Sequence, residues 1–332
     1  MTVRSISLLL LLVPMTAQLG DAQAASPELL RLLELKADGR EFVEATRRFD
    51  LEQQKLIEWD LKLAGEHQDN GEPKLAVEKQ EDAKRRVALI DEAWRQVLGE
   101  YPNDSRANTY YGELLYDYLG DSMGGVQLWL LAIHVDDKEG RGHNNLAIHY
   151  FHSGDYDKGL KHLGKALKEE PKNPDFLYNA AQLYLNHFPF IAEKYDISKR
   201  KLYEQAMKHS RDAAKYAPDD YEIVSDYATN FYAAEGFEVK VDWKQAAEAW
   251  RAARKIAKSE EDKFFTLLNE GRTWLRASDN KNAAAALTQA LMIRPDSEAA
   301  KKLLDEANGQ SPAPESETSG PASDAGAAAP SQ

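Results

Sequence analysis

Small residues recur at a fixed spacing along the middle of this chain, and this spacing restricts the possible folds more than any other feature. In the clearest segment, counted from Gly140, Ala147, Gly159 and Ala166 occupy places 8, 20 and 27, and Pro171 occupies place 32. Glycine and alanine let two helix backbones approach closely, because no large side chain stands between them. The spacing therefore predicts helices that pack in pairs.

The same offsets recur in four further segments between Ser105 and Pro295. Their small residues are Gly112, Gly124, Ala181, Ala206, Ala213, Ala228, Ala246, Ala253, Gly271, Ala283 and Ala290. In the first of these segments, Gly124, Leu128 and Leu131 are expected at places 20, 24 and 27. Place 24 is an apolar place, whereas places 8, 20 and 27 hold small residues. Leu131 is the one large residue at these three places in the five segments, so small residues fill 14 of 15 places. A repeated helical hairpin is predicted over residues 105–296.

This pattern resembles the tetratricopeptide repeat (TPR), a helix–turn–helix unit of 34 residues. The resemblance implies an all-α fold, built as a right-handed superhelical solenoid of antiparallel helix pairs. It also implies that the first helix of each pair lines a concave face that binds proteins or peptides. Residues Ser297 to Asn308 are predicted to form a capping helix, with Ser297 as the N-cap residue.

Two helices are predicted before the repeats, from about Glu41 to Glu66 and from about Pro73 to Gly99. Asp69-Asn70-Gly71-Glu72-Pro73 is typical of the turn between them. Trp59 and Trp94 are large apolar residues on these helices, and both are expected in the core. The pair is interpreted as a degenerate repeat that caps the front of the array.

The two ends of the chain differ from its body. Arg4, the apolar run Ile6 to Val13 and Ala22-Gln23-Ala24 are typical of a cleaved signal peptide. The alternative, a membrane anchor, needs an apolar run of roughly 20 residues. Four regions are therefore expected: a signal peptide (1–24), an N-terminal helical hairpin and capping region (25–104), TPR-like repeats with a C-terminal capping helix (105–308) and a disordered tail rich in Ser, Pro and Ala (309–332). We expect a periplasmic or secreted protein without a membrane span after cleavage.

Composition and motifs exclude several classes of function. Asp and Glu number 55 against 42 Lys and Arg, a net charge of −13, which argues against nucleic-acid binding. The chain has no cysteine, so thiol chemistry and cysteine-bound metals are excluded. It also carries no phosphate loop, nucleophile elbow or metalloprotease motif. We expect no enzyme and no cofactor. His149 and His152 are three residues apart on one helix and leave a metal site as a remote alternative.

The resemblance to TPR proteins also indicates which side chains face a partner. Asparagine recurs at the sixth place as Asn145, Asn179 and Asn269, where the family pairs such amides with an extended peptide backbone. The alternative is that these amides only cap or solvate their helices. The other predicted partner-binding residues are Arg106, Tyr110, Glu113, Tyr116, Arg141, His152, Tyr178, Gln182, Tyr232 and Arg272. Thr109 and Tyr178 stand where the family's carboxylate-binding members carry lysine.

Two insertions interrupt the repeat spacing. About 13 residues are added around Asn186 to Ile191, and about six around Gly236 to Val241. Both are predicted to be loops between the two helices of a pair. Phe188, Phe190 and Phe237 make them more apolar than a solvated loop, which is typical of a partner-contact site. The alternative is that the two insertions pack on each other or on the helices.

Together these features predict an exported adaptor or scaffold that binds a protein or an extended peptide on its concave face. A self-assembling structural protein of the envelope is the first alternative. A carrier of a metal or small ligand is the second. The identity of the partner and the oligomeric state are left open by the sequence.

Overall fold

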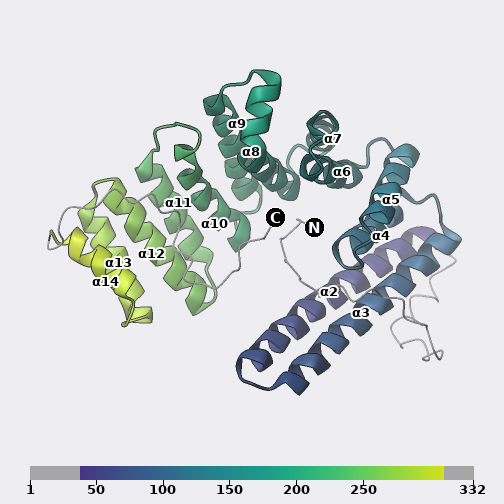
Figure 1. Cartoon of the computed structure of the whole chain (residues 1–332), viewed down its shortest axis with the longest axis horizontal. Helices are drawn as coiled ribbons and strands as arrows, with labels where there is room; N and C mark the ends of the chain where they lie inside the picture. Colours follow the sequence, from purple (N-terminus) through teal and green to yellow (C-terminus); the bar gives the residue numbers. More distant parts are fainter. Residues whose placement is uncertain (1–37, 310–332) are drawn as a thin grey trace. The chain divides into compact units, whose positions relative to one another are not determined.

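A computed structural model describes residues 38–309, and all regular structure within this range is helical (Figure 1). The helices are α2 (Gly39–Asp69), α3 (Pro73–Glu100), α4 (Ser105–Asp117), α5 (Ser122–Val135), α6 (Gly140–His152), α7 (Tyr156–Glu169), α8 (Pro174–Tyr195), α9 (Lys199–Tyr216), α10 (Tyr221–Thr229), the 3-10 helix η1 (Asn230–Glu235), α11 (Trp243–Ile256), α12 (Glu260–Arg276), α13 (Asn280–Ile293) and α14 (Glu298–Ala307). The all-α prediction is confirmed. The signal peptide and the tail from residue 310 onward lie outside the described residues.

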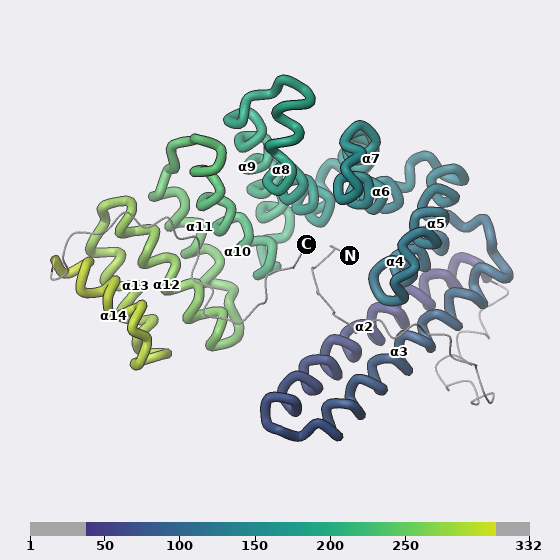
Figure 2. Tube along the Cα trace, viewed as in Figure 1, coloured from purple at the N-terminus to yellow at the C-terminus, as the bar shows by residue number. Residues whose placement is uncertain are grey.

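The chain divides between Glu169 and Glu170 into two compact units. The first holds α2 to α7 and the second α8 to α14. Within each unit, consecutive helices run antiparallel and pack in pairs, as the tube in Figure 2 shows. Each unit has its own core, with Trp94 fully buried in the first and Trp250 fully buried in the second. The predicted helix pairs are therefore present in both units.

The N-terminal hairpin agrees with the predicted bounds, but it is not a repeat-sized pair. Helices α2 and α3 have 31 and 28 residues, whereas α4 to α7 have 13 or 14 each. Trp94 is buried as predicted and donates its indole N–H to Asp50. The prediction for Trp59 is wrong, because its side chain is 55% exposed. On α2 the neighbours Ile57 and Asp60 face α3, so Trp59 points away from the hairpin seam.

The small residues lie where the helices meet, with one correction in the first repeat. Gly112 on α4 approaches Gly125 on α5, not Gly124: a Cβ atom at Gly125 would stand 2.7 Å from the carbonyl oxygen of Gly112. Seven residues later Ala132 is fully buried, whereas Leu131 is 36% exposed. The connection between α4 and α5 is thus one residue longer than assumed. The one exception to the small-residue pattern disappears with this shift, and Trp129 replaces Leu128 in the core.

The predicted register holds in the other repeats. The alanines at the predicted places are fully buried: Ala147, Ala166, Ala181, Ala206, Ala213, Ala228, Ala246, Ala253, Ala283 and Ala290. At the two glycine places the partner is a side chain: Gly159 lies against the ring of Phe151, and Gly271 lies against Leu287. After the last pair, α14 is capped as predicted, because the Ser297 hydroxyl accepts the backbone N–H of Ala300.

The two insertions differ from the predicted loops. The first extends α8 to Tyr195 through Pro189 and so forms no loop, which corrects the prediction. The second follows η1, where the first helix of its pair tightens into a 3-10 turn. The rings of Phe188 and Phe237 pack with their centroids 3.9 Å apart, and Phe237 is only 2% exposed. The alternative in which the insertions pack on each other is therefore confirmed. Phe190 is 57% exposed.

Candidate functional site

In the first unit, a buried carboxylate joins three helices. Glu113 on α4 is 4% exposed and stands between Arg47 on α2 and Arg141 on α6. Each guanidinium approaches a different carboxylate oxygen of Glu113 at 3.3 Å. The side-chain amide of Asn145 on α6 donates to the Oε1 atom of Glu113 at 3.0 Å. The first helices of neighbouring pairs are thus connected through one acidic side chain.

The electrostatics of this cluster favour the ionised form of Glu113. Burial by itself raises the pKa of the carboxyl group. The positive charges of Arg141 and Arg47 and the hydrogen bond from Asn145 act against burial, and the pKa of Glu113 is lowered. A buried carboxylate is stable only when it is paired in this way. The cluster therefore carries a fixed charge pattern over the whole physiological pH range.

Tyrosine rings extend the same cluster along α4. The guanidinium of Arg47 lies 4.1 Å from the ring centre of Tyr110, and that of Arg141 lies 5.7 Å from it. Six residues further along α4, Tyr116 packs on Trp129, and its hydroxyl lies 3.3 Å from Nδ1 of His149. These rings present flat amphipathic surfaces of the kind that are enriched at protein interfaces.

Arg106 and His152 stand apart from this cluster. The guanidinium of Arg106 pairs with Glu44 at 2.6 Å and with Asp104 at 3.0 Å. This pairing ties the start of α4 to α2. His152 is the last residue of α6, and its side chain is exposed. The charge of Arg106 is thus partly neutralised by two carboxylates of its own unit.

The second unit has a different polar cluster, centred on Asp226 of α10. The amide of Gln182 on α8 lies 2.9 Å from both carboxylate oxygens of Asp226, and Asn230 donates to one of them at 2.7 Å. Burial raises the pKa of Asp226 to about 7, against the opposite effect of these two hydrogen bonds. On α8, Tyr178 is half-buried, whereas Asn179 is 4% exposed. A carboxyl group that titrates near neutral pH therefore stands among the predicted partner-facing residues.

The last predicted residues lie on η1 and α12. Asn269 is fully buried, donates to the carbonyl of Phe265 at 2.9 Å and accepts from Arg272 at 3.3 Å. The amide of Asn269 therefore makes hydrogen bonds within its own helix, as in the alternative to binding a peptide backbone. Tyr232 packs on Trp243 with ring centres 5.6 Å apart. Asn269 and Tyr232 belong to the interior of their unit.

The structure thus brings Tyr110, Glu113, Arg141 and Asn145 together in the first unit, with Tyr116 further along α4. In the second unit it joins Arg272 to Asn269, whereas Arg106 and His152 stand apart from the cluster around Glu113. Sequence reasoning missed Arg47, because the long front hairpin was interpreted only as a cap. The predicted binding residues did not include Asp226 either, although the resemblance places it, as the sixth residue of its repeat, on the inward face.

Within residues 38–309, no three His, Asp or Glu side chains lie together in a way that could hold a metal ion. None of the helices in that range combines the length and the apolar character of a membrane span. Two histidines from neighbouring helices, His143 and His162, approach each other with their Nδ1 atoms 2.8 Å apart.

Comparisons with known proteins agree with this architecture. Residues 150–187 match the family model described as tetratricopeptide repeat. No curated protein matches the sequence. Among solved structures, the chain is similar to the C-terminal part of a TPR repeat-containing protein from Cytophaga hutchinsonii, with 15% identity, coverage of 83% of this chain and 99% of that one, and a TM-score of 0.47. It is also similar to pilF of Pseudomonas aeruginosa, with 13% identity, coverage of 76% and 99%, and a TM-score of 0.46.

A third similar structure is YrrB, described as a TPR protein with an unusual peptide-binding site. It is 16% identical, and the match covers 64% of this chain and 97% of that one with a TM-score of 0.45. The matched repeat at residues 150–187 spans α7 and most of α8. Both helices were predicted from the spacing of their small residues. Residues 150–187 are thus similar to a tetratricopeptide repeat, and they lie within a series of antiparallel helix pairs.

Proposed function

We propose that this protein is an exported adaptor that binds a protein or an extended peptide along the first helices of its repeats. The observation that carries the proposal is the cluster of Tyr110, Glu113, Arg141 and Asn145, which lies across α4 and α6. Tyr110 and Arg141 are half-buried and reach the surface, whereas Glu113 and Asn145 are buried and hold the charge of Arg141 in place. An aromatic ring beside a fixed positive charge suits a partner that offers both backbone and side-chain contacts.

The proposal distinguishes the first helices from the second helices, so the test compares them. Asn145→Ala/Asn179→Ala removes amides from α6 and α8. Gln127→Ala/Gln289→Ala removes two exposed amides from the second helices α5 and α13 and serves as the matched control. Partners are captured from an envelope fraction by tagged protein and quantified by mass spectrometry. We expect loss of partners only with the asparagine variant. Equal recovery with both variants would show that the first helices do not bind the partners.

Export is the second part of the proposal and rests on the N-terminal sequence. Arg4, the apolar run that follows it and Ala22-Gln23-Ala24 support cleavage after Ala24. N-terminal sequencing of the protein recovered from cells would then begin at Ala25. An intact Met1 in the recovered protein would contradict export through this signal.

The self-assembly alternative used the two apolar insertions as contacts. Phe237 and Ile191 are buried within the second unit, so of these apolar side chains only Phe190 is well exposed. Light scattering over a concentration series separates the two functions. A constant mass supports the adaptor, whereas growth of the mass with concentration supports assembly.

A further inference from the structure

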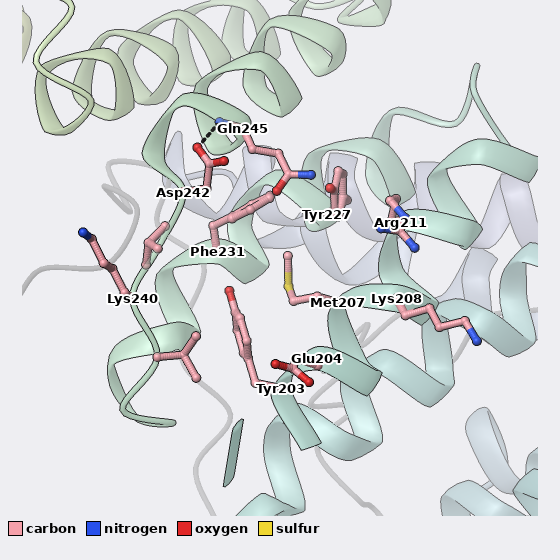
Figure 3. A pocket seen from close by; sticks show the side chains of 12 residues that line it. Tyr203, Glu204, Met207, Lys208, Arg211, Tyr227, Phe231, Lys240, Asp242 and Gln245 are labelled. Atoms are coloured by element: carbon pink, nitrogen blue, oxygen red, sulfur yellow. Dashed lines mark hydrogen bonds between the residues drawn. The ribbon is translucent and has the colours of Figure 1, made fainter. Parts of the chain in front are cut away.

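A pocket lies in the second unit between α9 and the segment that joins η1 to α11. Its volume is about 400 Å³, and it is lined by α9, α10, η1 and the insertion that follows η1. Figure 3 shows Tyr203 and Met207 at its centre, with Lys240 on one side and Lys208 and Arg211 on the other. The pocket is built from different residues than the predicted partner-binding surface. The pocket is therefore distinct from that surface.

The wall of the pocket is formed by the insertion that departs from the repeat spacing. Val239, Lys240 and Val241 line it directly. The insertion is fixed at its base by Phe237, whose ring packs between Phe188 at 3.9 Å and Tyr203 at 5.4 Å. The backbone N–H of Val239 also donates to the carbonyl of Ala234 at 3.0 Å. The wall is thus held in place without a ligand, as expected for a preformed site.

The floor of the pocket is apolar and aromatic. Phe231 is 4% exposed and Tyr203 is 7% exposed, while Met207 and Tyr227 are half-buried and accessible from the pocket. An aromatic ring would gain contacts with the tyrosine rings and with the methionine sulfur. The floor therefore favours one large apolar side chain of a ligand, preferably an aromatic one.

The rim carries positive charge in a chain whose net charge is −13. Lys208, Arg211 and Lys240 are all exposed at the rim. Two acidic residues also line the pocket: Glu204, and Asp242, which caps α11 by accepting the backbone N–H of Gln245 at 3.0 Å. Arg211 lies 3.8 Å from Asp212. Lys208 and Lys240 stand on opposite sides of the apolar floor, where their ammonium groups can pair with carboxylates placed on either side of an apolar group.

We propose that this pocket binds an acidic peptide segment of a partner protein through one aromatic side chain flanked by carboxylates. The aromatic ring enters between Tyr203, Met207 and Tyr227. The flanking carboxylates pair with Lys208 and Arg211 on one side and with Lys240 on the other. This site goes beyond the proposed adaptor function, because it uses none of the side chains on which that function rests.

The test uses the full protein with its methionine methyl groups labelled with ¹³C. Met207 reports on the pocket, whereas Met123 and Met292 are 64% and 78% exposed elsewhere and serve as internal controls. The probe is the blocked peptide acetyl-Glu-Asp-Phe-Asp-Glu-amide. Two matched peptides replace Phe by Ala or all four acids by Lys. We expect a saturable shift of the Met207 signal with the first peptide only, at concentrations up to about 5 mM, the range of weak peptide binding.

Charge reversal at the rim completes the test. Lys208→Glu/Arg211→Glu should weaken binding of the acidic peptide at least tenfold, whereas Lys201→Glu, on the same helix outside the pocket, should change it less than twofold. Circular dichroism confirms that the helices persist in each variant. The proposal is overturned if Met207 does not shift, if the Ala or Lys peptide shifts it equally, or if Met123 and Met292 shift together with Met207.

Discussion

At the residue scale, the backbones of α4 and α5 approach closely at Gly112 and Gly125. A Cβ atom at Gly125 would meet a backbone carbonyl oxygen, which cannot rotate away as a side chain can. Gly125→Ala should therefore push α5 from α4 and destabilise the protein by about 1–3 kcal/mol, the usual cost of overpacking. Urea denaturation followed by circular dichroism measures the change.

Gly164 is the matched control for this substitution. It lies in α7, is exposed, and no atom would stand within 4 Å of an added Cβ. Gly164→Ala should stabilise the protein by about 0.5–1 kcal/mol, because alanine loses less entropy in a helix. Equal effects of the two substitutions would contradict the close-approach explanation.

Asp226 supplies a second prediction at this scale. Its pKa rises from 3.8 to about 7 on folding, so the folded state binds more protons than the unfolded state between these values. The contribution of Asp226 to stability therefore falls as the pH rises from about 4 to about 7. Asp226→Asn removes this loss. The variant should exceed the wild type in stability at pH 8 by more than at pH 4. A difference that is independent of pH would contradict the raised pKa.

At the scale of elements, α6 and α7 are joined by the pair His143 and His162. Burial, followed by the nearby charges of His143 and of lysines on α7, lowers the pKa of His162 to about 4, and burial also lowers the pKa of His143. The unfolded chain binds more protons than the folded chain between about pH 4 and the ordinary histidine value of 6.5. The histidine pair therefore does not lower the free energy of unfolding above pH 6.5. Below pH 6.5, the free energy of unfolding declines as the pH falls.

His162→Gln should remove part of that decline, because a neutral amide cannot be protonated. Thermal unfolding at pH 7 and at pH 5 measures it. We expect the wild type to lose more stability between these values than the variant does. The same loss in both proteins would show that the histidine pair is not responsible.

The elements themselves were largely predictable from the sequence. Close packing of two helices requires small residues at regular places, so the spacing identified every repeat helix pair. It failed where one residue changes the register, as at Gly125, and where an insertion can continue a helix, as at Pro189. Neither event has a local sequence signal, because both depend on packing against the neighbouring helix. Trp59 failed for a related reason, since a two-helix hairpin buries only one face of each helix.

The candidate site was less predictable than the fold. The repeat places indicated Tyr110, Glu113, Arg141 and Asn145, which all lie on first helices. Arg47 comes from a hairpin outside the repeat pattern, so no offset pointed to it. The pocket beside Tyr203 depends on how an insertion folds back, and sequence spacing contains no information about that. Sites within the repeats follow from periodicity, whereas sites built by departures from it require the structure.

At the scale of the whole molecule, the division between Glu169 and Glu170 has a thermodynamic consequence. Each unit encloses its own core: Trp94, Ile90 and Leu114 are buried in the first, and Trp250 and Leu268 in the second. Repeat proteins derive their stability from contacts between sequential neighbours, and most such contacts lie within one unit here. Residues 38–169 and 170–309 should therefore each fold when expressed alone.

Circular dichroism and denaturation of the two fragments test this expectation. Each should show a helical spectrum and a cooperative transition. The sum of the two spectra should approach that of residues 38–309. The second fragment keeps the complete pocket beside Tyr203, so binding of the acidic peptide to this pocket should remain with it. An unfolded fragment would show instead that the units depend on each other for stability, and binding of the acidic peptide would then require the intact chain.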